Sequence, residues 1–111
     1  MRRAFALLLL CLLPALSQAQ TFTVLQRPMT LTTTEGQLFG TLLLPKTSEK
    51  VPVVLLIAGS GPTDRNGNNP VGGNNDSLKL LAQHLAQHGI ASLRYDKRGI
   101  AASQPATPDE R

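Results

Sequence analysis

The sequence has few of the residues that thiol chemistry and base stacking require. Its 111 residues include one cysteine, no tryptophan, one tyrosine and three phenylalanines. The cysteine, Cys11, lies in an apolar run near the start, so cleavage of a leader after that run would leave no thiol for a disulfide, a metal or a nucleophile. The basic side chains form no stripe and have few aromatic neighbours, which argues against nucleic-acid binding.

The first 19 residues have the pattern of a secretory signal peptide. Arg2 and Arg3 form a basic start, residues 4–16 are apolar, and residues 17–19 are small enough for cleavage. The apolar run is shorter than the roughly 20 residues of a membrane-spanning helix and contains Pro14. We expect a periplasmic or secreted protein with no stable membrane anchor, and no lipid anchor, because Cys11 does not lie at a cleavage point.

Removal of the leader also changes the charge. Without Arg2 and Arg3, nine of the 11 basic side chains remain against seven acidic ones, a net charge near +2. Residues 20–111 can form one small domain or part of a larger one, but they are too few for a complete two-layer enzyme of ordinary size.

The pattern of the mature chain predicts an α/β fold. Residues 21–44 are rich in threonine and apolar residues, and Glu35-Gly36 is a turn signal between strands at 29–33 and 38–44, so we expect an antiparallel hairpin that Pro45 closes. Residues 51–58 are apolar without alternation, which is typical of a parallel strand covered on both faces.

A helix and a further strand follow. Asp76 is the expected N-cap and Gly89 the expected stop of the helix, and residues 90–94 are the expected strand. The apolar face of the helix has five members at helical spacing: Leu78, Leu81, Ala82, Leu85 and Ala86. Strand, helix and strand predict a parallel βαβ crossover. The connection at 63–75 is long and rich in asparagine and glycine, which is typical of a functional or mobile segment.

The turn Gly59-Ser60-Gly61 lies at the carboxyl end of the first parallel strand, where α/β sheets bind ligands. One interpretation is an oxyanion hole, with the Ser60 N–H as donor. The other is a glycine turn needed only for packing, and these three residues do not decide between them. The glycine spacing matches neither a dinucleotide fingerprint nor a phosphate-binding loop.

No metal or other cofactor is expected. Residues 64–68 place oxygen ligands at alternate positions, but the glycine of a calcium loop is displaced and Asn75 stands where its closing glutamate belongs. His84 and His88 lack the glutamate of a zinc-protease helix, so we expect a solvated pair. Asp96 and Arg98, past the second parallel strand, are candidates for an ion pair at the rim of the site, with Asp64 or Arg65 as further partners.

No serine has the surroundings of a nucleophile elbow, which needs glycine two positions before and two after. Ser60 has Ala58 and Pro62 at those positions, and Ser77, Ser92 and Ser103 also fail. The sequence therefore contains no candidate catalytic nucleophile.

Two blocks resemble the amino-terminal part of exported bacterial α/β-hydrolases of the esterase-like or serine-aminopeptidase-like group. They are the turn at 59–68, Gly-Ser-Gly-Pro-Thr-Asp-Arg-Asn-Gly-Asn, and the segment at 93–99, Leu-Arg-Tyr-Asp-Lys-Arg-Gly. The resemblance covers nearly all of the mature chain and about the first third of such an enzyme. It departs from the pattern at Asn66, where aspartate is frequent, and at Ala101, where glycine is frequent.

The resemblance implies that residues 20–111 are the amino-terminal portion of an α/β-hydrolase domain that acts on a small ester or related acyl substrate. The Ser60 N–H would serve the oxyanion hole, and the nucleophile, acid and histidine would follow further along. We expect this segment alone to be inactive, and poorly soluble or partly unfolded, since it encodes one helix for a strand that needs two covered faces. The alternative is an exported, non-catalytic remnant or small binding protein.

Overall fold

The computed structural model describes residues 21–106. The expected signal peptide at 1–19 and its Cys11 lie outside the described residues and stay predictions. Within residues 21–106 no helix is both long and apolar enough to cross a bilayer.

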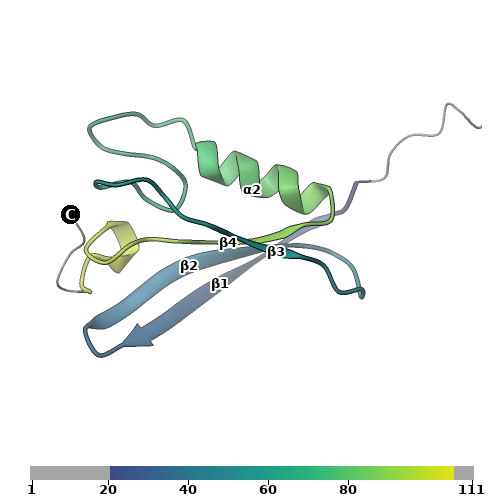
Figure 1. Ribbon diagram of the computed structural model, residues 1–111, viewed down its shortest axis with the longest axis horizontal. Helices are drawn as coiled ribbons and strands as arrows, with labels where there is room; N and C mark the ends of the chain where they lie inside the picture. The colour runs from purple at the N-terminus through teal and green to yellow at the C-terminus, as the bar shows by residue number, and fades with distance from the viewer. Residues whose placement is uncertain (1–20, 107–111) are drawn as a thin grey trace, which may run out of the picture.

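A four-stranded mixed sheet forms the centre of the fold (Figure 1). Its strands are β1 (Val24–Thr33), β2 (Gly36–Pro45), β3 (Val53–Leu56) and β4 (Ala91–Tyr95), in the order β1-β2-β4-β3. The helix α2 (Ser77–Gln87) and the short 3₁₀ helix η2 (Ala101–Ser103) complete it. The expected incomplete α/β arrangement, a hairpin leading into a βαβ unit, is confirmed.

The hairpin is longer than its predicted strands. β1 and β2 pair antiparallel from Val24 opposite Pro45 to Thr33 opposite Gly36. At the turn, the Thr33 hydroxyl donates to the Gly36 carbonyl at 2.7 Å and accepts from the Glu35 N–H at 3.2 Å. A side chain that bonds its own turn in this way stabilises the reversal that Glu35-Gly36 predicted.

The βαβ unit is also confirmed. β3 pairs with β4 in parallel, and β4 pairs on its other side antiparallel with β2. Gly89 ends the helix in the left-handed region, with φ 87°, and the Ile90 N–H returns to the Leu85 carbonyl at 2.9 Å. This is the C-terminal geometry for which glycine is preferred.

The beginning of α2 differs from the prediction. Asp76 occupies the cap position, but its backbone is left-handed (φ 55°) and its carboxylate makes no capping hydrogen bond. The carbonyl of Asn66 accepts from the Leu78 and Lys79 N–H groups instead, at 3.0 and 3.4 Å. The long loop folds back over the helix start and supplies with its backbone the acceptor that a cap side chain usually provides.

The apolar core lies between the sheet and one face of α2. Leu43, Ala82 and Ala86 are buried together, with Val24 and Leu56 packed against them. Two members of the expected helix face, Ala82 and Ala86, are thus at its centre. The expectation that Leu81 belongs to the buried face of the helix is wrong, because the residue is 45% exposed.

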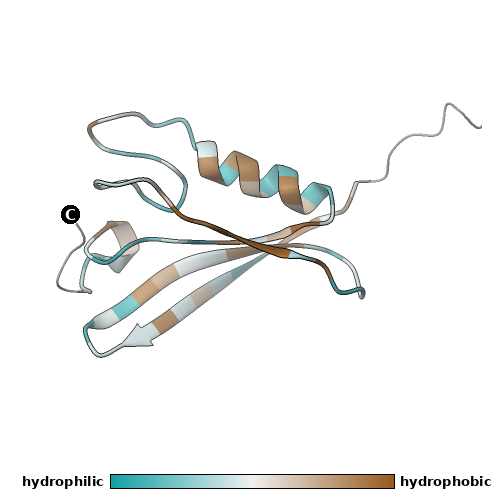
Figure 2. Ribbon diagram, viewed as in Figure 1, coloured by the Kyte–Doolittle hydropathy of each residue, from teal (hydrophilic) through white to brown (hydrophobic). Residues whose placement is uncertain are grey.

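The expectation that residues 51–58 form a strand covered on both faces is wrong for the described chain. β3 is limited to four residues, and Val53, Leu55 and Ile57 are 62%, 53% and 62% exposed. Figure 2 shows β3 as a continuous apolar segment. Its outer edge and one face have no neighbour among residues 21–106, because α2 packs mainly over β2 and β4.

Candidate functional site

The carboxyl ends of β3 and β4 lead into two loops at the same end of the sheet (Figure 1). Residues 57–76 connect β3 to α2, and residues 96–100 connect β4 to η2. Because β3 and β4 are parallel neighbours, the two loops meet there, as expected for a ligand site in an α/β sheet.

The Gly59-Ser60-Gly61 turn lies beside Lys97, a residue that sequence reasoning missed. The Lys97 ammonium donates to the Gly59 carbonyl at 2.7 Å and to the Gly61 carbonyl at 2.9 Å, and Lys97 is only 3% exposed. Gly61 has φ 86°, a left-handed value that favours glycine. A lysine directly after the strand was the available signal, but nothing in the sequence indicates that its charge is buried.

Asp96 joins the two loops. Its carboxylate accepts from the Arg65 backbone N–H at 2.8 Å and from the Ala102 N–H at 3.2 Å, and it pairs with the Arg65 guanidinium at 3.2 Å. Asp96 is 2% exposed. A buried carboxylate is stable when several donors satisfy it, as here.

The expected ion pair between Asp96 and Arg98 is wrong. Arg65, offered as a further partner, is the true partner of Asp96, because the β3–α2 loop places its backbone and side chain over the end of β4. Arg98 instead pairs with Glu35 of the hairpin turn at 2.6 Å, with both side chains about 40% exposed.

Hydrogen bonds between its own side chains and backbone organise the long loop. Asp64 accepts from the Asn66 and Asn68 N–H groups at 2.8 and 3.0 Å, so the carboxylate faces its own loop. Asn68 exchanges two hydrogen bonds with Asp76, at 2.6 and 2.8 Å. At Gly67 (φ 86°) an added Cβ would lie 2.5 Å from the Ser77 hydroxyl. These contacts give the asparagines a structural role.

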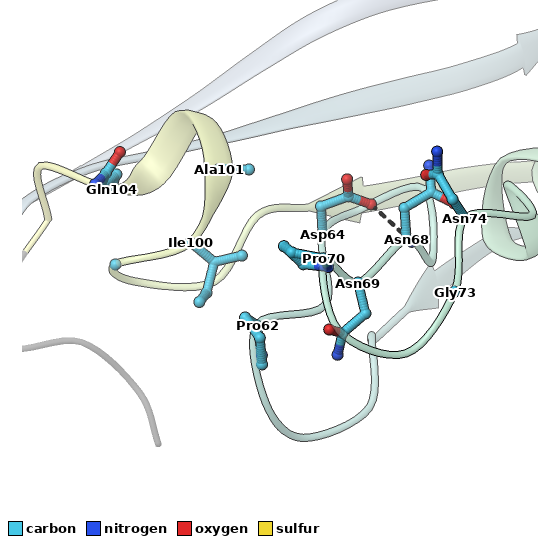
Figure 3. Close-up of a pocket in the computed structure, with 11 residues that line it drawn as sticks. Pro62, Asp64, Asn68, Asn69, Pro70, Gly73, Asn74, Ile100, Ala101 and Gln104 are labelled. Carbon is cyan, nitrogen blue, oxygen red and sulfur yellow. Dashed lines mark hydrogen bonds between the residues drawn. The ribbon is translucent and has the colours of Figure 1, made fainter.

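A cavity of about 560 Å³ opens between the two loops. Figure 3 shows Pro62, Asp64 and the asparagines of the long loop on one side and Ile100, Ala101 and Gln104 on the other. Its lining is more apolar than polar, and asparagine and glutamine side chains supply much of the polar part, so it suits a small molecule with an apolar part and a few polar groups.

A second cavity of about 540 Å³ is lined by residues of the hairpin, the long loop, α2 and β4, and three of its lining residues are cations: Arg65, Lys79 and Arg94. Arg94 donates to the Asn66 side-chain oxygen at 2.8 Å and is 3% exposed. Burial, and then the neighbouring Arg65, lowers the pKa of Arg94 from its ordinary value, against the opposing influence of nearby aspartates.

No serine of the described chain has the environment of a catalytic nucleophile. Ser103 is buried and its hydroxyl accepts from the Phe39 N–H at 2.9 Å, while Ser92 is buried within β4. Ser48, Ser60 and Ser77 are exposed. No hydrogen bond joins either histidine to a serine of the described chain. His88 bonds the His84 carbonyl through Nδ1 at 2.8 Å, and both rings are exposed.

The described residues contain no group of three or more histidine, cysteine, aspartate or glutamate side chains arranged to hold a metal. Ala101, where the resemblance expects glycine, has φ 45°. A left-handed conformation costs a residue with a Cβ about 1 kcal/mol, so the alanine strains the turn into η2.

Solved structures that resemble the chain include two esterases with a TM-score of 0.5 or above. A cold-adapted esterase from an Arctic intertidal metagenomic library has a TM-score of 0.54 and 17% identity, over 83% of this chain and 35% of that one. A bacterial heroin esterase has a TM-score of 0.50 and 22% identity, over 87% of this chain and 28% of that one. This chain carries part of an α/β-hydrolase fold.

A third structure, an α/β serine hydrolase without a lid from Xanthomonas campestris, has a TM-score of 0.48 and adds no weight. No protein-family model and no curated protein matches the chain. The chain spans about a third of the length of the two esterases. At these identities the likeness establishes the α/β-hydrolase fold and leaves the reaction to be argued from the site.

Proposed function

We propose that this chain is the amino-terminal portion of an exported serine esterase and contributes the oxyanion turn of its active site. The observation that carries the proposal is the placement of Gly59-Ser60-Gly61 at the carboxyl end of β3, in a fold that two esterases share. Within residues 21–106 the Ser60 N–H meets no acceptor, so it is available to a ligand. A donor that meets the developing oxyanion lowers the barrier of acyl transfer by about 3 kcal/mol.

The reaction would be acyl transfer from a small ester or related acyl compound. A serine, a histidine and an acid would come from residues beyond this sequence, since none of its serines has the required turn. The serine would attack the ester carbonyl as the histidine takes its proton, and the Ser60 N–H would stabilise the tetrahedral oxyanion. The residues at 1–19 would direct the protein out of the cytoplasm.

The alternative is an exported protein that binds a small molecule without turning it over. The cavity between the two loops supports it, because its amide-rich walls are already formed in this chain. Under this alternative the turn at 59–61 serves packing alone.

A fluorophosphonate probe distinguishes the two. We expect the full gene product to be labelled and to hydrolyse p-nitrophenyl acetate, and residues 20–111 alone to do neither. Substitution of the labelled serine by alanine should remove both signals in the full product, with the fold retained by circular dichroism. A full gene product that is folded, unlabelled and inactive would contradict the esterase proposal and favour the binding protein.

A further inference from the structure

The buried charge of Lys97 has no carboxylate partner among the described residues. Its ammonium bonds only two backbone carbonyls, of Gly59 and Gly61, and the residue is 3% exposed. A buried ammonium loses several kcal/mol of hydration, which neutral carbonyls offset less well than a carboxylate does. An apolar side chain would therefore fill this position at lower cost. What the lysine adds is the pair of hydrogen bonds to the Gly59–Gly61 turn.

The first of these bonds fixes the direction of one amide hydrogen. In a trans peptide the C=O of one residue and the N–H of the next point in opposite directions. Because the Gly59 carbonyl points at Lys97, the Ser60 N–H points away from Lys97. The Gly61 carbonyl belongs to the peptide of Pro62, which has no N–H, so the second bond anchors the turn without redirecting another donor.

The turn is open to solvent at Gly59 and Ser60. A Cβ built on Gly59 meets no atom within 4 Å, and Ser60 is exposed. A substrate oxygen can thus approach the Ser60 N–H. The cation also polarises the peptide it holds, and a carbonyl bonded to a positive charge makes the N–H at the other end of its peptide a stronger donor.

We propose that Lys97 is a positioning residue, which holds the Gly59–Gly61 turn so that the Ser60 N–H faces the oxyanion of the substrate. The oxyanion part rests on the esterase function proposed above. The orientation of the turn does not, and the two parts are tested separately.

The first test is the crystal structure of the full gene product and of its Lys97→Met variant. The Gly59 carbonyl should point at the Lys97 ammonium, with the Ser60 N–H directed away from it. In Lys97→Met the Gly59–Ser60 peptide should turn out of that orientation while β4 keeps its place. Lys50→Met, which changes an exposed lysine before β3, is the matched control and should alter neither.

Two results would overturn the orientation. One is a Ser60 N–H directed toward Lys97 in the crystal structure of the unsubstituted protein, which decides the matter even where a variant fails to fold. The other is an unchanged direction of the Ser60 N–H in Lys97→Met. Lys97→Arg, which keeps the charge but cannot place one nitrogen between both carbonyls, should show a smaller departure than Lys97→Met.

The second test uses the full gene product and p-nitrophenyl acetate. Loss of an oxyanion donor lowers kcat by about 10²- to 10³-fold, so a donor that is only misdirected in Lys97→Met should lower kcat about 10- to 100-fold. KM should stay within about twofold, since the donor acts mainly in the transition state. Lys97→Arg should recover part of the loss.

The outcomes separate the two proposals. An active full product whose kcat is unchanged by Lys97→Met would refute the positioning role and leave the esterase intact. An inactive full product would refute the esterase and, with it, the oxyanion part of this inference, whereas the crystal structures would still decide the orientation of the turn.

Discussion

The carboxyl end of the sheet and the outer face of β3 differ in how well residues 21–106 cover them. At the carboxyl end, Arg94, Asp96 and Lys97 are at most 3% exposed and each is bonded by loop residues. On β3 and just after it, Val53 and Ile57 are both 62% exposed. Charged groups are thus buried and hydrogen-bonded in one region, with only the Nε of Arg94 and the hydroxyl of Ser92 lacking a partner among the described residues, while apolar groups lie open in the other.

The difference shows that the site's polar framework and the stability of the fold have different sources. The polar framework comes mainly from the two loops and the end of β4, within residues 57–104. One further contact comes from β2, where the Thr41 hydroxyl accepts from the Arg65 guanidinium at 2.9 Å. Apolar cover for β3 needs further elements of secondary structure on its open face and edge. Residues 21–106 therefore hold the geometry of the candidate oxyanion turn without complete apolar cover for β3.

The largest expected effect concerns Asp96. In Asp96→Ala, Arg65 loses its carboxylate and two backbone N–H groups lose their acceptor. We expect the free energy of unfolding to fall by about 3 kcal/mol, near the lower end for a broken buried pair because Arg65 keeps some solvent contact. Urea unfolding followed by circular dichroism measures it. Glu35→Ala, which breaks an exposed pair, is the control, and an equal loss in both variants would contradict the central role of Asp96.

The second effect concerns the open face of β3. Leu55 is 53% exposed, so Leu55→Lys should remove an apolar contact between chains at little cost to the fold. We expect self-association of residues 20–111 to weaken about tenfold or more. Sedimentation velocity measures it. Val71→Lys changes a 90% exposed residue of the long loop and should have no such effect. Equal self-association of the unsubstituted chain, Leu55→Lys and Val71→Lys would show that β3 is not the surface through which the chains associate.

The third effect concerns Ala101, whose φ is 45°. Ala101→Gly should raise the free energy of unfolding by about 0.5 to 1 kcal/mol, because removal of the strain exceeds the extra freedom of glycine in the unfolded chain. Ala102→Gly, one residue further, has no positive φ to relieve and should lower stability by about 0.5 to 1 kcal/mol. Thermal unfolding of both variants tests the opposite signs, and the same sign in both would refute the strain.

The smallest effect concerns Arg98. Its pair with Glu35 is exposed, and such pairs contribute about 0 to 1 kcal/mol. A double-mutant cycle of Arg98→Ala and Glu35→Ala should give a coupling below about 0.5 kcal/mol that falls further in high salt. A coupling above about 2 kcal/mol would mean that the Arg98–Glu35 pair anchors the loop after β4.

The sequence predicted the elements that local patterns determine. Glu35-Gly36 located the hairpin turn, Gly89 located the end of α2, and the apolar run at 51–58 located a parallel strand. It did not predict the cap of α2, because the acceptor is a backbone carbonyl of Asn66, which has no residue signature.

The sequence also could not predict which charges pair in the site. Asp96 is two residues from Arg98 but bonds Arg65, 31 positions away, because the long loop returns over the end of β4. The burial of Lys97 depends on the same return. The spacing of residues within one segment gives no sign of a contact between residues so far apart in the chain. The oxyanion role of Ser60 stays a proposal.

The central claim is that this chain alone organises the polar end of the sheet. Amide hydrogen exchange of residues 20–111, resolved by NMR, tests it most directly. The account predicts that the Arg65, Asn68 and Ala102 amides, which bond to aspartate carboxylates, are protected about as well as the amides that join β2 to β4. Exchange of these three amides at the rate of an unfolded peptide, while β2 and β4 remain protected, would contradict it.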